Sequence, residues 1–140
     1  MKLCAAALAI FLTALPAAAE TFPGPFPVRV VRVLDGDTVL VAVRLWFAQT
    51  LTERVRIAGI DAPEGGKGAR CPAEAEAAER ASQRLGELLA AGQVELWNVR
   101  RERYGRALAR VTVGGRDVAM AMISEGLARP YGGERRGGWC

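Results

Sequence analysis

The sequence predicts an α+β domain: a five-stranded β-barrel with one long helix inserted after the third strand and a short C-terminal helix. Two observations support this prediction. Short stretches of alternating apolar residues, which are typical of strands, recur along the chain, and one segment carries apolar residues at helical spacing. A five-stranded barrel with an inserted helix is the arrangement of an OB-fold, whose open face commonly holds oligonucleotides.

Residues 1–19 are predicted to be a secretory signal and not part of the folded domain. One lysine is followed by an apolar run and by three alanines at 17–19, so cleavage is expected before Glu20. The apolar run is shorter than the ~20 residues that a transmembrane helix needs. A buried N-terminal helix is the alternative interpretation. The expected organisation is a signal peptide at 1–19, a Pro- and Gly-rich leader at 20–27 and the domain at 28–140, in an exported protein that is periplasmic or secreted.

The five strands are expected where apolar residues alternate or form short runs. These stretches are 28–34, 38–45, 52–60, 93–98 and 106–113. Between the third strand and the helix, the glycine-rich segment 64–70 is predicted to be a loop. Trp46, Phe47 and Trp97 are expected to pack in the core or locally.

The inserted helix is expected at 71–92. Pro72 suits its first turn, and Gly92 suits its C-terminal cap. Its apolar residues recur on one face, which predicts packing against the barrel. They are Ala78, Ala81, Leu85, Leu88 and Leu89. A short helix over 117–125 is expected to end at Gly126.

The charge of the chain is modestly basic. Removal of Lys2 with the signal lowers Lys plus Arg from 19 to 18 against 15 Asp plus Glu, so the net charge falls from +4 to +3. Five arginines are concentrated in one segment: Arg100, Arg101, Arg103, Arg106 and Arg110. A local basic patch suits a phosphate-bearing partner, although most such patches are only solvated surface.

The cysteines favour one disulfide. Cys4 leaves with the predicted signal, so Cys71 and Cys140 remain, and an even pair in an oxidising compartment favours a bond between them. This bond would close a loop of roughly 70 residues, which the loop-entropy account values at ~4 kcal/mol. A zinc site is the alternative, but two thiols cannot complete a zinc shell in a chain without histidine.

Three motifs concentrate carboxylates and arginines at the ends of predicted strands. They are DGDT with Asp35 and Asp37, VRIAGIDAPE with Arg56, Asp61 and Glu64, and RERYGRALA with Tyr104 and Arg106. Asp37 and Asp61 supply hard oxygen ligands, which suit Ca²⁺ and not a soft metal. Arginine can donate two parallel hydrogen bonds to phosphate oxygens, so Arg56 and Arg106 suit a phosphate clamp. For Arg56, the alternative is a plain surface ion pair with Asp61 or Glu64.

These motifs, in this order and with a helix before the third, resemble the staphylococcal nuclease-like (thermonuclease) family. The match runs from about Val30 to Tyr131. The resemblance implies a calcium-dependent nuclease that cleaves DNA and RNA, acts as a monomer, prefers single strands or frayed duplex, and does not bind membranes once the signal is removed. It also implies that Ca²⁺ is bound by Asp37, Asp61 and the backbone carbonyl of Ala62.

By the same resemblance, Glu64 positions or activates the attacking water as the general base. Arg56 and Arg106 stabilise the phosphoryl transition state, and Asp35 supports the metal ligands. The residues expected to contact substrate are Arg103, Tyr104 and Tyr131. Tyr104 either stacks on a base or covers the rim of the barrel.

Two departures from the family leave product length and substrate preference open. The loop between Glu64 and the helix is shorter, and no further helix is expected after Gly126. The alternative function is a catalytically silent OB-fold that only binds nucleic acid or a protein, and a third is an exported structural or inhibitor module. Silent domains are expected to lose the arginines, the glutamate or the aspartates, and the chain retains all of them, which favours the enzyme.

Overall fold

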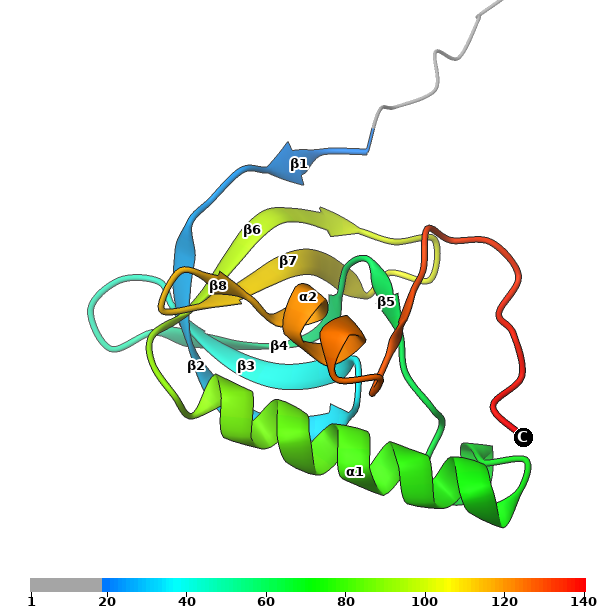
Figure 1. Cartoon of the computed structure of the whole chain (residues 1–140). Helices are drawn as coiled ribbons and strands as arrows, with labels where there is room; N and C mark the ends of the chain where they lie inside the picture. Colours follow the sequence, from blue (N-terminus) through cyan, green and yellow to red (C-terminus); the bar gives the residue numbers. More distant parts are fainter. Residues whose placement is uncertain (1–18) are drawn as a thin grey trace, which may run out of the picture.

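The structure, a computed structural model, describes residues 19–140 (Figure 1). The predicted secretory signal lies outside the described residues, except for Ala19. Within the part of the chain that the structure describes, no helix combines the length and the apolar character needed to span a bilayer.

Five strands form a closed barrel, as the sequence predicts. They are β2 (Phe26–Asp35), β3 (Thr38–Arg44), β4 (Thr50–Ile57), β6 (Val94–Arg101) and β7 (Ala107–Val113). Neighbouring strands are antiparallel except β4 and β7, which pair in parallel, and the β6–β7 pairing closes the ring. Alternation places Val39, Val41, Val55 and Ile57 in the fully buried core. The predicted α+β class with an OB-like barrel is confirmed.

Strand boundaries differ from the prediction in two places. β1 (Thr21–Phe22) pairs with β6 and β2 begins at Phe26, so part of the expected leader belongs to the sheet. The expected third strand is divided into β4 and β5 (Ile60–Asp61), because Gly59 adopts a φ of 86°, a left-handed conformation that glycine tolerates. β5 pairs outside the barrel with β9 (Arg129–Pro130).

Helix α1 (Pro72–Leu89) lies along the barrel and follows a glycine-rich loop with one 3₁₀ turn, η1 (Gly66–Gly68) (Figure 1). Its apolar face packs into the core, as its spacing predicts, through Ala78, Ala81, Leu85 and Leu89. The short helix α2 (Val118–Ser124) follows β8 (Arg116–Asp117). Asp117 caps α2, because its side chain accepts a backbone N–H of the first turn.

Two of the three aromatic residues that were expected to pack in the core or locally are exposed instead. Trp46 and Phe47 lie at the β3–β4 turn and are 64 % and 88 % exposed, so this prediction is wrong. Phe47 has a φ of 49°, and residues of such a turn belong to neither face of the flanking strands. Trp97 is half-buried, and its indole N–H donates to the hydroxyl of Thr112 at 3.0 Å, which agrees with local packing.

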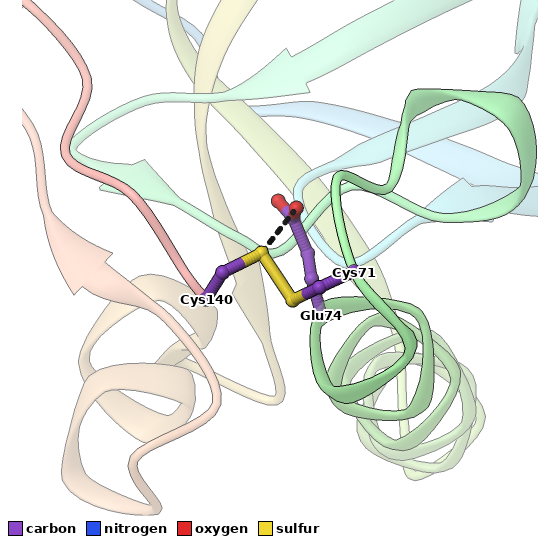
Figure 2. A group of neighbouring side chains, drawn as sticks. All are labelled: Cys71, Glu74 and Cys140. Atoms are coloured by element: carbon purple, nitrogen blue, oxygen red, sulfur yellow. Dashed lines mark hydrogen bonds between the residues drawn. A yellow bond between two sulfur atoms is a disulfide. The ribbon is translucent and has the colours of Figure 1, made fainter.

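The C-terminal segment 131–140, called the tail below, returns toward the start of α1 (Figure 1). There Cys140 is bonded to Cys71, the residue before α1, across a Cα–Cα distance of 6.0 Å (Figure 2). The structure therefore contains the predicted disulfide. Because the two sulfurs are bonded to each other, neither can serve as a thiolate ligand for zinc.

Candidate active site

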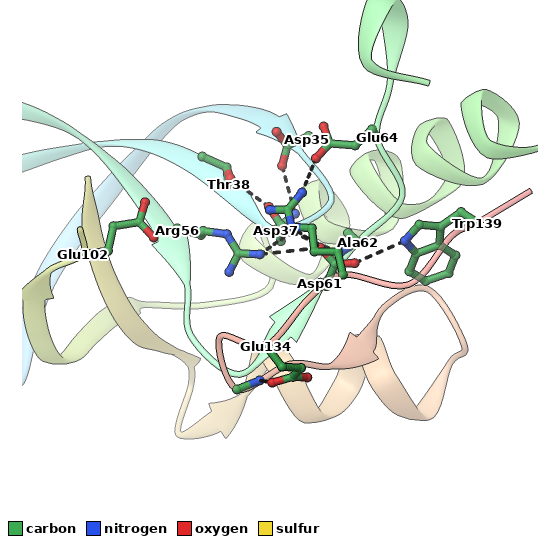
Figure 3. A network of polar contacts seen from close by, with 12 residues as sticks. Asp35, Asp37, Thr38, Arg56, Asp61, Ala62, Glu64, Glu102, Glu134 and Trp139 are labelled. Carbon is green, nitrogen blue, oxygen red and sulfur yellow. Dashed lines mark hydrogen bonds and ion pairs between the residues drawn. The ribbon is translucent and has the colours of Figure 1, made fainter. Parts of the chain in front are cut away.

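Carboxylates from separate parts of the chain meet in one cluster (Figure 3). Asp35 and Asp37 flank the β2–β3 turn, Asp61 ends β5, and Glu64 begins the loop that leads to α1. Asp37 and Asp61 are only 6 % and 4 % exposed. The sequence-predicted carboxylates are therefore brought together, and two of them are buried.

Gly36 allows the β2–β3 turn to approach its neighbours closely. A Cβ atom at this position would lie 2.8 Å from the Cβ atoms of both Ala62 and Ala81. The turn thus packs against the segment after β5 and against α1 at once, and this packing sets Asp37 beside Asp61. The glycine of DGDT is needed here because it lacks a side chain.

Arg56 lies between the two buried aspartates. Val55 and Ile57 point into the core, so Arg56 projects from the opposite face of β4. Its Nη2 atom lies 3.2 Å from Oδ2 of Asp37 and 3.7 Å from Oδ1 of Asp61. Because Arg56 is only 3 % exposed, the alternative of a plain surface ion pair is wrong.

Both oxygens of Asp37 accept hydrogen bonds. Oδ2 accepts from Arg56 and from the backbone N–H of Ala62 at 3.1 Å, and Oδ1 accepts from the hydroxyl of Thr38 at 2.9 Å. Asp35 accepts the backbone N–H of Asp37 at 3.1 Å and so supports the turn. Burial, and next the charge of Asp37, raise the pKa of Asp35 to about 6.

Asp61 has one oxygen that lacks a hydrogen-bond donor among the described residues. Its Oδ2 accepts from the indole N–H of Trp139 at 3.3 Å. Its Oδ1 is buried and accepts no hydrogen bond, although Nε of Arg136 lies 3.0 Å away, so this contact is an ion pair without hydrogen-bond alignment. A buried carboxylate oxygen without a donor is well suited to a hard cation.

Glu64 is more accessible than the aspartates, with 46 % of its side chain exposed, and its Oε1 lies 2.5 Å from Nη1 of Arg136. Arg136 thus bridges Glu64 and Asp61. Burial lowers the pKa of Arg136, but the hydrogen bond with Glu64 and the charges of Asp61 and Asp37 outweigh it and raise the pKa. The field of the cluster is therefore negative and attracts a cation.

A buried carboxylate on α1 fixes the loop that carries Glu64. Glu74 is 3 % exposed, and its oxygens accept the backbone N–H groups of Glu64 at 3.3 Å and of Arg70 at 2.8 Å. Sγ of Cys140 lies 3.7 Å from the same carboxylate (Figure 2), a contact in which the disulfide sulfur has no hydrogen to donate. Glu74 was not among the site residues predicted from the sequence, although an acidic residue in the first turn of a helix is a recognisable signal.

Arg106 does not contact the carboxylate cluster. It directly precedes β7 and forms a close ion pair with Glu102. Leu108 pairs with Arg56 in the parallel β4–β7 ladder, and residues two apart share a face of a strand. The two predicted clamp arginines therefore project from the same side of adjacent strands, but only Arg56 contacts the aspartates.

A cavity of about 740 Å³ adjoins Arg56 between the β6–β7 connection and the tail. Its lining includes Arg100, Arg103, Tyr104, Tyr131 and Arg135. Tyr104 is 80 % exposed, so it does not cover the rim of the barrel, and its ring is accessible for stacking on a base. The ring of Tyr131 lies 5.2 Å from the guanidinium carbon of Arg56.

Arg136 and Trp139 of the tail both contact Asp61. Neither residue was predicted from the sequence. The motif match drawn from the sequence runs only to Tyr131, before either of them. The available signal was the pairing of Cys140 with Cys71, which brings the last residues of the chain back to its middle.

Fold and site together define a class of protein: an OB-like barrel whose buried carboxylates and arginine lie beside a basic cavity with two tyrosines. The chain belongs to the staphylococcal nuclease family. The family described as "Staphylococcal nuclease homologue" matches residues 54–136, a range that includes Arg56, Asp61, Glu64 and Arg106.

Curated relatives agree with this family. The chain is 36 % identical over 135 residues to Micrococcal nuclease of Shigella flexneri, and the aligned stretch covers 90 % of this chain and 67 % of that protein. It is 37 % identical over 101 residues to Endonuclease YncB of Bacillus subtilis, which covers 70 % of the chain and 44 % of that protein. It is also 34 % identical over 140 residues to Protein ParB of Escherichia coli, which covers 94 % of the chain and 69 % of that protein. The chain thus spans about two thirds of the first and third relatives and less than half of the second.

Proposed function

We propose that the chain is an exported, calcium-dependent nuclease that hydrolyses phosphodiester bonds of DNA and RNA. It is a nuclease by its family, whose members include proteins named micrococcal nuclease and endonuclease. Metal dependence is supported by one observation above all: Asp37 and Asp61 are buried side by side, and one oxygen of Asp61 accepts no hydrogen bond within the described residues. Phosphodiester hydrolysis needs a nucleophilic water, neutralised phosphate charge and a stabilised transition state.

Asp37 and Asp61 would hold the metal ion, and the backbone carbonyl of Ala62 and water would add further ligands. All of these ligands are oxygens, which fits the preference of Ca²⁺. When bound, the ion would neutralise charge on the phosphate oxygens. Asp35 supports Asp37 by accepting its backbone N–H.

Glu64 is the residue that we assign to the attacking water. Its carboxylate is accessible, it follows Asp61 by three residues, and Glu74 fixes its backbone. Glu64 can accept a hydrogen bond from water and take its proton as the water oxygen bonds to phosphorus and one ester P–O bond breaks; the leaving oxygen takes a proton from solvent. This role requires that Glu64 exchange its ion pair with Arg136 for water.

Arg56 and Arg106 are assigned to the phosphate. A guanidinium can donate two parallel hydrogen bonds to phosphate oxygens, which a lysine cannot. The ion pairs with Asp37 and Asp61 already fix the side chain of Arg56, so it gives up little further rotational freedom in the transition state. Arg106 would exchange Glu102 for a phosphate oxygen when substrate binds.

The adjoining cavity suits a nucleic-acid strand. Arg103 can contact backbone phosphates, and Tyr104 and Tyr131 offer ring faces to bases. Such contacts read the backbone and the base faces, not the base edges, which supports activity on both DNA and RNA. A base can stack on Tyr104 when it is unpaired, so single strands or frayed duplex ends are the favoured substrates.

Digestion of plasmid DNA, single-stranded DNA and RNA by residues 20–140 tests this function. We expect cleavage of all three with Ca²⁺ and none with chelator. Asp61→Ala should abolish cleavage. Glu95→Ala should retain it, because Glu95 lies on β6 opposite Pro27 and Thr112. Binding of nucleic acid without cleavage in Ca²⁺ would instead favour the catalytically silent module.

Export is proposed from the predicted signal. Expression of the full chain in a bacterium, followed by fractionation and N-terminal sequencing, should yield protein that begins at Glu20 in the periplasm or the medium. Uncleaved protein that remains in the cytoplasm would contradict this proposal.

A further inference from the structure

The tail brings a cation to carboxylates of the proposed metal site. Nε of Arg136 lies 3.0 Å from Oδ1 of Asp61, and Nη1 lies 2.5 Å from Oε1 of Glu64. Oδ1 of Asp61 is the same buried oxygen that accepts no hydrogen bond among the described residues. Arg136 therefore neutralises the atom of the cluster that is best suited to bind a metal ion.

Three contacts hold the tail in this position. Cys140 is bonded to Cys71, the indole N–H of Trp139 donates to Oδ2 of Asp61 at 3.3 Å, and the guanidinium of Arg129 lies 3.6 Å from the centre of the Trp139 ring. The Arg136 side chain itself is 38 % exposed. The tail is thus anchored at its end, while Arg136 can turn outward without disturbing the core.

We propose that Arg136 is an internal cation of the metal site, which competes with the divalent metal ion for Asp61 and Glu64. This inference rests on the proposed metal dependence. A guanidinium and a divalent cation repel each other at a separation of a few ångströms, and Asp61 is buried, so a metal ion bound to its Oδ1 would weaken the 3.0 Å contact of Arg136 with that oxygen. Arg136 therefore neutralises the carboxylates in the metal-free protein and is displaced when the metal binds.

This exchange has a consequence for Glu64. While Arg136 is paired with Glu64, that carboxylate is not available to a water. Displacement of Arg136 by the metal ion releases Glu64, so Glu64 becomes available to bind water when the metal ion binds. Arg136 thus determines how tightly the site binds metal and links metal binding to the state of Glu64.

Arg135 provides a matched control. It carries the same charge, is the preceding residue and lines the neighbouring cavity, but it has no ion pair with a described carboxylate of the cluster. Removing either charge lowers the general repulsion of a cation to a similar extent. A specific competition affects Arg136 alone.

Calorimetric titration of Ca²⁺ into residues 20–140, without nucleic acid, tests the proposal. We expect Arg136→Gln to bind Ca²⁺ about tenfold more tightly than the wild type, which corresponds to about 1.4 kcal/mol. Arg135→Gln should stay within about twofold of the wild type. Thermal denaturation of both variants in chelator checks that each is folded at the titration temperature.

A second measurement does not depend on a variant that folds well. In the wild type labelled with ¹⁵N, the Nε–H resonance of Arg136 should shift during the Ca²⁺ titration, with the same midpoint as the calorimetric binding. A resonance that does not move while Ca²⁺ binds would overturn the competition.

The measurements separate competition by Arg136 from the proposed metal dependence. Wild-type protein that binds Ca²⁺ and cleaves nucleic acid, with Arg136→Gln binding no tighter than Arg135→Gln, would overturn the inference and leave the proposed function standing. Wild-type and Arg136→Gln proteins that neither bind Ca²⁺ nor cleave with it would overturn both.

Discussion

Replacement of Arg56 by glutamine should destabilise the metal-free protein far more than removal of a surface arginine. The change leaves Asp37 and Asp61, at 6 % and 4 % exposure, without the guanidinium that they share. Removing one partner of a buried ion pair costs about 3–5 kcal/mol. Arg136 still compensates Asp61, so we expect the lower end of this range, about 3 kcal/mol of the free energy of unfolding.

Arg101 is the matched control for this prediction. It pairs with Glu53 at 2.6 Å, a shorter distance than any contact of Arg56, but its side chain is 62 % exposed. Exposed ion pairs contribute little to stability because water screens them, so Arg101→Gln should lower the free energy of unfolding far less than Arg56→Gln does. Burial, and not distance, should decide the difference between the two variants.

Urea denaturation followed by circular dichroism, first in chelator and then with Ca²⁺, provides the measurement. At a free Ca²⁺ concentration of about 100 times the dissociation constant, binding should add about 2.7 kcal/mol to the stability of the wild type. Arg56→Gln should gain at least as much, because the ion supplies charge that the variant lacks. Equal losses for Arg56→Gln and Arg101→Gln in chelator would refute the reasoning, since the aspartates would then tolerate the loss of their buried partner.

The remaining predictions concern single positions of the site and the tail. Asp61→Ala should lose cleavage while its circular dichroism stays native, and full activity would contradict the metal assignment. Glu64→Gln and Arg106→Lys should slow single-turnover cleavage by about a hundredfold or more while an uncleavable oligonucleotide still binds, whereas losses confined to binding would assign them to substrate grip. Cys140→Ser should lower the free energy of unfolding by about 4 kcal/mol for a closed loop of 69 residues, with peptide mapping of the wild type showing one linked pair. The pKa of Asp35 is raised from 3.8 to about 6, so between these values the folded state keeps a proton that the unfolded chain has already lost. The free energy of unfolding in chelator should therefore fall as pH rises from 4 to 6. Asp35→Asn should flatten this slope, and an unchanged slope would contradict the shift.

The barrel could be predicted because apolar residues alternate along its strands and their side chains point into the core. This period of two can be read directly from the sequence, as at Val39 and Val41 on β3 and at Val55 and Ile57 on β4. The break at Gly59 could not be predicted, because an apolar residue flanks it on each side and the stretch resembles one continuous strand. Only the pairing of β5 with β9, far along the chain, separates the two pieces.

In the candidate site too, residues within local motifs could be predicted, whereas residues brought in by long-range contacts could not. The aspartates, Arg56 and Glu64 lie within short motifs at strand ends, so residue type and spacing are enough to group them. Arg136 meets Glu64 from 72 residues away, through a tail whose position depends on the disulfide at Cys140, and no local period encodes such a contact. The motifs therefore identify the groups suited to act on a phosphate, whereas the cation that balances them comes from a segment outside the motifs. It follows that substitutions at Arg136 should change metal affinity more than the chemistry of cleavage.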